Sequence, residues 1–125
     1  GGAMVFIASK NALVASPNAS AYCTAKASEI HLARCLALEG APFGIRVNVM
    51  HPNAVFDTGI WTPEVLEKRA ASYGISVDAY KKNNVLQVEI TSKDVAALAC
   101  TMVGPLFAKT TGAQVPIDGG NDRVI

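Results

Sequence analysis

Three side chains near the start of the chain have the types and the spacing for acid–base chemistry on an alcohol or a carbonyl group. Tyr22 and Lys26 are spaced i and i+4 in a segment typical of helix, which places both on one helical face. A free phenol has a pKa near ~10, and a nearby ammonium lowers a phenol pKa because it favours the phenolate. Ser9 ends an apolar run, and its hydroxyl can hydrogen-bond the same substrate oxygen. These residues are therefore candidates for proton transfer at neutral pH.

The order of apolar segments predicts an α/β fold. Residues 4–8, 45–50 and 113–117 are short runs typical of buried strands, and helical segments separate them. Strands separated by helices pair in parallel through right-handed crossovers. We therefore expect a three-stranded parallel sheet with flanking helices, in which the first strand has one unpaired edge.

Capping residues predict where the helices begin and end. Ser20 fits an N-cap of a long helix that reaches Glu39, with Gly40 as its stop. Thr91 and Asp94 fit a capping box. Three shorter helices are expected to begin after Thr62, Ser76 and Thr91.

Composition limits the class of protein. The 125 residues are 50% hydrophobic and 17% charged, which is typical of one globular domain with an apolar core. The formal net charge is +1 and no long basic run occurs, so we expect neither a nucleic-acid nor a membrane partner. Cys23, Cys35 and Cys100 lack the spacing of metal ligands or redox motifs. They indicate free thiols, no bound metal and a reducing, cytoplasmic location.

The chain resembles the short-chain dehydrogenase/reductase family in three motifs that occur in the family's order. The motifs are Ser9 with the Tyr22–Lys26 pair, residues 44–52 (GIRVNVMHP) and residues 111–120 (TGAQVPIDGG). The resemblance implies the C-terminal half of a Rossmann-like, doubly wound parallel sheet. The Gly-rich turn with which complete members bind the cofactor pyrophosphate is absent from these 125 residues. We therefore expect one domain, residues 1–125, that is a C-terminal fragment without the N-terminal dinucleotide-binding half.

The resemblance also implies a role for each site residue. Tyr22 is the general acid–base, Lys26 hydrogen-bonds the nicotinamide ribose of NAD or NADP, and Ser9 orients the substrate oxygen. The implied cofactor contacts are Tyr22, Lys26, Pro52, Asn53, Val55 and Thr58. Asn53 stands where the family has Gly, and Asn tolerates left-handed backbone well enough for the turn to survive. Relative to the family's motif, Phe56 stands as one additional residue between Val55 and Thr58.

Two histidines and a group of apolar side chains have more than one interpretation. His51 fits a packed loop histidine or a contact to cofactor or substrate, and His31 fits a surface or an interface. Phe56, Ile60 and Trp61 fit either a lid over the substrate or the packing of the loop.

The implied activity is the NAD(P)-dependent interconversion of an alcohol and an aldehyde or ketone, with the isolated fragment inactive. Residues 52–61, 69–78 and 109–112 narrow the resemblance to the dehydrogenase domain of bifunctional rhamnulose-1-phosphate aldolase/alcohol dehydrogenases. That resemblance implies lactaldehyde or a sugar-derived substrate. As partners we expect a second copy of the chain, in a homo-oligomer, or the missing N-terminal half. The alternatives are a non-catalytic structural or oligomerisation remnant of such a domain, and a complete enzyme cleaved during preparation.

Overall fold

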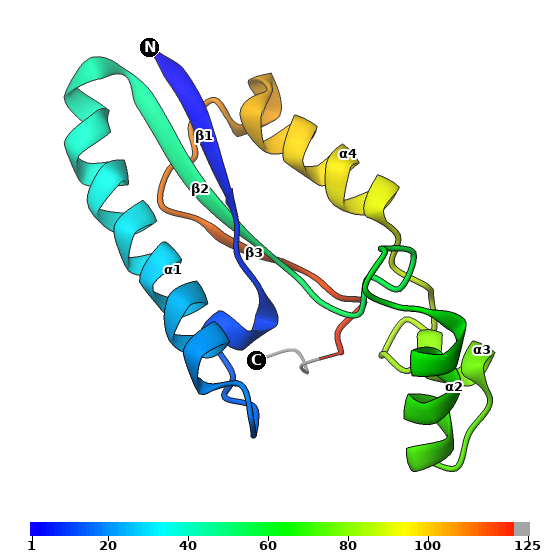
Figure 1. Cartoon of the computed structure of the whole chain (residues 1–125). Helices are drawn as coiled ribbons and strands as arrows, with labels where there is room; N and C mark the ends of the chain where they lie inside the picture. Colours follow the sequence, from blue (N-terminus) through cyan, green and yellow to red (C-terminus); the bar gives the residue numbers. More distant parts are fainter. Residues whose placement is uncertain (122–125) are drawn as a thin grey trace.

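The computed structural model describes residues 1–121, which form an open sheet with helices on both faces (Figure 1). The strands are β1 (Gly2–Ile7), β2 (Ile45–Pro52) and β3 (Gln114–Ile117). All pairs are parallel and the order is β1-β2-β3, as the sequence predicts. Within residues 1–121, β1 pairs with β2 alone, so its other edge is open, as expected.

The two faces of β2 are covered by different helices. Its side chains at Val47 and Val49 pack against α1 (Ser20–Gly40), whose contribution to this core is Ile30, Ala33 and Ala37. Side chains alternate between the faces of a strand, so Arg46 points the other way. There its guanidinium donates hydrogen bonds to three carbonyl groups at the end of α4 (Ser92–Val103), those of Met102, Val103 and Gly104. Figure 1 shows α1 and α4 on opposite sides of the sheet.

The predicted ends of the long helix are wrong at both termini. Ser20 is the first helical residue, and Ala19 precedes it without a side-chain cap. The helix also passes through Gly40 and continues as a 3-10 turn, Ala41–Phe43, until Gly44 takes a left-handed φ of 69°. Gly40 serves close packing instead, because a Cβ at Gly40 would lie 3.1 Å from the Cβ of Ile45 at the start of β2.

The shorter helices begin where their caps predict. They are α2 (Pro63–Ser72), α3 (Val77–Lys81) and α4, and a 3-10 turn without a side-chain cap, Pro105–Phe107, follows α4. Their N-cap side chains, which accept hydrogen bonds from the first turns, are those of Thr62, Ser76 and Thr91. Asp94 completes the predicted capping box at α4 by accepting from the Thr91 amide. Local side-chain chemistry therefore fixes these three helix starts.

Three general features of residues 1–121 bear on function. No helix in this part of the chain is long and apolar enough to cross a membrane. No group of three or more His, Cys, Asp or Glu side chains there is placed to hold a metal ion. The three cysteines are free thiols.

Replacing Met102 by Ala should test how far the α4 face of the sheet supports the fold. Met102 is completely buried, so its truncation should lower the free energy of unfolding by about 2–5 kcal/mol through lost burial and a residual cavity. Urea denaturation of the 125-residue chain measures the change. Leu106→Ala is the control, because Leu106 is 84% exposed and its loss should change stability by less than about 0.5 kcal/mol. Equal losses in the two variants would contradict this packing.

Candidate active site

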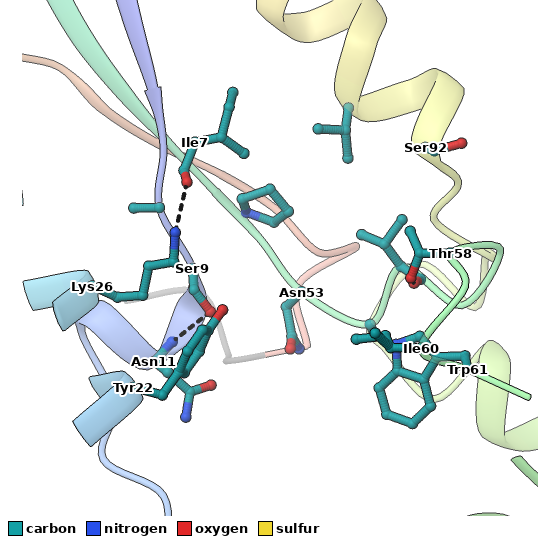
Figure 2. A pocket seen from close by; sticks show the side chains of 15 residues that line it. Ile7, Ser9, Asn11, Tyr22, Lys26, Asn53, Thr58, Ile60, Trp61 and Ser92 are labelled. Carbon is teal, nitrogen blue, oxygen red and sulfur yellow. Dashed lines mark hydrogen bonds between the residues drawn. The ribbon is translucent and has the colours of Figure 1, made fainter. Parts of the chain in front are cut away.

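A cavity of about 530 Å³ opens at the C-terminal ends of β1 and β2 (Figure 2). Its walls come from the end of β1, the first turns of α1, the loop after β2 and the start of α4. All seven predicted site residues line it: Ser9, Tyr22, Lys26, Pro52, Asn53, Val55 and Thr58. In open parallel sheets, ligands bind at this end of the strands. The structure therefore brings the predicted residues together, and their individual roles stay predictions.

Ser9 is fixed by the 3-10 turn that follows it, Lys10–Ala12. Its Oγ accepts a hydrogen bond from the Asn11 amide at 3.2 Å, and its carbonyl oxygen accepts one from the Ala12 amide at 3.0 Å. Ser9 is buried, with 9% of its surface exposed. Within residues 1–121 its hydroxyl hydrogen nevertheless has no acceptor. The hydroxyl can therefore donate to a substrate oxygen in the cavity.

Tyr22 and Lys26 reach the cavity from α1, as the i, i+4 spacing predicts. Tyr22 is 50% exposed, so its phenol is accessible to a ligand. Lys26 Nζ donates to the carbonyl oxygen of Ile7 at 3.2 Å, which ties α1 to the end of β1 (Figure 2). It also forms an ion pair with Glu29, at 2.9 Å from Oε1. Among the described residues, no hydrogen bond joins Tyr22 to Lys26.

Glu29 and Asn11 are two functional neighbours that the sequence interpretation missed. Glu29 is one helical turn beyond Lys26, and the i, i+3 rule for opposite charges would have found it. Asn11 lines the cavity, and its side-chain amide donates to Cys23 Sγ at 3.4 Å. No sequence spacing indicates that contact, since it depends on how the 3-10 turn meets α1.

The turn after β2 differs from the expectation for Asn53. The left-handed residue is Ala54, with φ of 57°, and Asn53 is not among the residues with positive φ. The reason is that the β2–β3 ladder extends to Asn53, whose amide donates to the Ile117 carbonyl at 3.3 Å. The chain reverses only at the next residue. A left-handed alanine costs about 1–2 kcal/mol, so the surrounding contacts hold this turn against strain.

Aromatic side chains support the loop that follows. The buried ring of Phe56 contacts Trp61 at 4.8 Å and Tyr80 at 5.2 Å between centroids. Phe56 thus packs the loop onto α3, whereas Trp61 and Ile60 line the cavity. Burial raises the pKa of the Tyr80 phenol above its ordinary value. The packing interpretation is therefore confirmed for Phe56, and a lid formed by Ile60 and Trp61 stays a prediction.

Asp57 fastens the same loop to α4. Its carboxylate accepts from the Ser92 amide at 2.8 Å and from the Ser92 hydroxyl at 2.7 Å. These two hydrogen bonds hold the pKa of Asp57 below its usual range. Thr58 turns its hydroxyl back to the Val55 carbonyl at 3.2 Å. The loop is therefore fixed on the cavity wall by contacts within the chain.

Parallel strands with helices on both faces, and a cavity at the C-terminal ends of the strands, define a Rossmann-like α/β fold. A family model described as enoyl-(acyl carrier protein) reductase matches residues 1–122. The chain belongs to the short-chain dehydrogenase/reductase family.

The chain is similar to parts of longer proteins. It is 46% identical to the uncharacterized oxidoreductase YuxG of Bacillus subtilis, over 96% of this chain and 18% of that protein. It is 35% identical to the D-beta-hydroxybutyrate dehydrogenase of Rhizobium meliloti, over 95% of this chain and 47% of that protein. A crystal structure of a short chain dehydrogenase family protein from Francisella tularensis gives a TM-score of 0.78 at 31% identity, covering 96% of this chain and 50% of that one. The chain thus spans half or less of the length of these relatives.

Two similar solved structures contain a nicotinamide cofactor. One is 4-hydroxyisoleucine dehydrogenase complexed with NADH, which is 26% identical with a TM-score of 0.74 and is covered over 46% of its length by 96% of this chain. The other is ElxO with NADP bound, which is 28% identical with a TM-score of 0.75 and the same coverage.

Acid should weaken the loop–α4 junction through Asp57. A carboxyl group whose pKa is lower in the folded than in the unfolded chain contributes its full stabilisation above the unfolded value, here about 3.8. That contribution disappears as the pH falls through the lower, folded value. We therefore expect Asp57→Asn to lower the Tm of the chain at about pH 6, and the difference from wild type to vanish toward about pH 2.

Thermal unfolding followed by circular dichroism over this pH range measures the effect. Asp78→Asn is the matched control for loss of one negative charge, because Asp78 lies on α3 and pairs with Lys82 at the surface. A Tm difference for Asp57→Asn that stays constant down to low pH would contradict the proposed role of the ionised carboxylate.

Proposed function

We propose that residues 1–125 form the C-terminal, catalytic half of an NAD(P)-dependent oxidoreductase that interconverts an alcohol and an aldehyde or ketone. The observation that carries the proposal is that one cavity collects Ser9, Tyr22 and Lys26 with the four loop residues expected to meet the cofactor. The proposal that the chain is a fragment is supported by how little of its relatives it covers, namely 47% of the length of one and 50% of the length of another.

In this mechanism the chain supplies the proton and holds the substrate oxygen. The Tyr22 phenol gives its proton to the carbonyl oxygen during reduction and takes one from the alcohol during oxidation. The Ser9 hydroxyl donates a hydrogen bond to the same oxygen, as its free hydrogen allows. The Lys26 ammonium, held by the Ile7 carbonyl, stabilises negative charge on the phenol oxygen. The nicotinamide, when bound, supplies or accepts the hydride.

The residues present fit one end of the cofactor. The cavity walls contain a cation, Lys26, and the turn at Pro52–Val55, which are suited to a ribose and a carboxamide. No Gly-rich turn for the pyrophosphate occurs in the sequence, so the rest of the cofactor needs residues from outside these 125. The preference for NAD or NADP would also be set there. Bound NADH and NADP in the two similar structures support either choice.

We propose that the open edge of β1 is where the missing half pairs. The edge strand carries half-exposed apolar side chains, with Met4 at 48% and Ile7 at 44% exposure. An open apolar edge binds another strand readily. In the isolated chain a second copy can take that place, which leads us to expect a homo-oligomer.

As the substrate we propose lactaldehyde or a related sugar-derived carbonyl compound. The support is the resemblance of residues 52–61, 69–78 and 109–112 to bifunctional rhamnulose-1-phosphate aldolase/alcohol dehydrogenases. The coverage of YuxG at 18% is in keeping with a long, multidomain relative. Free thiols favour a cytoplasmic location. The alternative is a non-catalytic structural or oligomerisation remnant, which the NADH-binding measurement below distinguishes from the proposed enzyme.

Replacing Tyr22 by Phe should abolish most of the activity of a protein that joins this chain to its N-terminal half. Loss of a placed proton donor costs about 10²–10⁴-fold in kcat. NADH oxidation with lactaldehyde and other short aldehydes is the assay. Tyr73→Phe is the matched control, because Tyr73 stacks on Tyr80 away from the catalytic cavity and should keep its activity. Equal activity in the two variants would exclude Tyr22 as the acid–base.

The isolated 125-residue chain should not bind NADH in a saturable manner, because it lacks a pyrophosphate turn. Trp61 lines the cavity and reports binding through its fluorescence. The longer protein, measured in parallel, should show saturable binding, and intact mass verifies both samples. Saturable micromolar binding by the isolated chain would contradict the fragment proposal. Absence of binding by the longer protein would favour the non-catalytic remnant.

A further inference from the structure

A buried histidine lies behind Ser9, outside the cavity. His51 belongs to β2 and is 2% exposed. Its Nδ1 lies 3.1 Å from the carbonyl oxygen of Ser9, and its Nε2 lies 2.7 Å from Oε1 of Gln114 in β3. Three adjacent chain segments, the end of β1, β2 and β3, are therefore linked through side chains at the level of Ser9.

The hydrogen-bonding capacity of these groups determines how the protons are placed. The Ser9 carbonyl oxygen only accepts, so His51 Nδ1 must carry the hydrogen. In an uncharged imidazole Nε2 is then an acceptor and needs a donor. Gln114 Nε2 is buried and has no partner within residues 1–121. Rotation of the Gln114 amide by a half turn directs this donor at His51 Nε2 and satisfies both groups.

We propose that His51 and Gln114 are positioning residues for Ser9. Gln114 donates to His51 Nε2 and fixes the tautomer, and His51 Nδ1 donates to the Ser9 carbonyl oxygen. That oxygen also accepts from the Ala12 amide at 3.0 Å, so both of its lone pairs are used. The peptide plane of Ser9 is thereby held, and with it the 3-10 turn whose Asn11 amide fixes the Ser9 hydroxyl.

The chemistry of the link favours positioning over packing. A buried polar group costs free energy unless each of its donors and acceptors has a hydrogen-bond partner. Apolar residues of the same shape would fill the space without that cost. A polar link does something that apolar packing does not: it fixes the direction of one carbonyl group. The catalytic meaning of this link rests on the proposed function, whereas the hydrogen bonds themselves do not.

The first test reads the tautomer in the isolated chain. The sequence has two histidines, and the other, His31, is exposed, so the background variant His31→Gln leaves a single imidazole. Long-range ¹H–¹⁵N correlation NMR at about pH 8, where an ordinary histidine is uncharged, should show a protonated Nδ1 and an unprotonated Nε2. A protonated Nε2 would overturn the proposal.

Amide hydrogen exchange extends this test to Ser9. In Gln114→Leu, the amides of Asn11 and Ala12 should exchange about tenfold faster, which corresponds to the loss of about one hydrogen bond. The Ala33 amide, in the middle of α1 and within the apolar core, is the reference and should change less. Unchanged exchange at Asn11 and Ala12, or an equal increase at all three amides, would contradict the positioning role.

The second test reads catalysis in the longer protein. His51→Leu should lower kcat about tenfold with KM for NADH unchanged, since Ser9 acts on the substrate oxygen. His51→Asn should recover most of kcat because the Asn amide can donate to the Ser9 carbonyl, and His31→Asn is the control. Equal loss in both His51 variants would overturn the proposal. A wild-type protein without activity would refute the proposed function alone, and the NMR results then decide on the positioning link.

Discussion

The geometry of the site depends on the parallel pairing of β2 with β1. Parallel strands end at the same edge of a sheet, so Ser9 after β1 and the turn after β2 arrive side by side. The register that pairs Ile7 with Met50 is held by burial of Val47 and Val49 under α1. A shift of one residue would turn both valines away from α1. Core packing that is distant from the cavity thus determines which residues meet in it.

The position of α1 is the second requirement, and small residues provide it. Ala33 and Ala37 are buried against the sheet, and Gly40 lets the end of the helix approach Ile45 closely. At the other end of the helix, the hydrogen bond from Lys26 to the Ile7 carbonyl joins α1 to β1. Because a helix is rigid over this length, these contacts at its two ends also place Tyr22 at the cavity.

The sequence predicts features that depend on interactions between residues close in the chain better than features that depend on contacts between distant segments. Strands, the caps at Thr62, Ser76 and Thr91, and the residues that line the cavity follow from local patterns and from the family resemblance. The predicted N-cap at Ser20 and the predicted helix end at Gly40 are wrong, because the position of a helix end depends on the preceding backbone and on tertiary packing. The left-handed residue is Ala54 and not Asn53 because the ladder to Ile117 extends one residue further. The link from Ser9 through His51 to Gln114 joins the segment after β1 to β2 and β3, and no local pattern contains it.

The contacts that hold the candidate catalytic side chains lie within this chain. Ser9 is held by Asn11, Lys26 by Ile7 and Glu29, and the loop by the Asp57–Ser92 hydrogen bonds. One of these contacts, the hydrogen bond from Lys26 to the Ile7 carbonyl, uses a backbone acceptor on the side of β1 that faces away from β2. A strand that paired at that edge, as we propose for the other half, would compete with Lys26 for this carbonyl, whereas the contacts of Ser9 and Asp57 do not involve the edge. The chain therefore holds Ser9 and the loop in place by its own contacts, whereas the proposed pyrophosphate contacts come from outside these 125 residues.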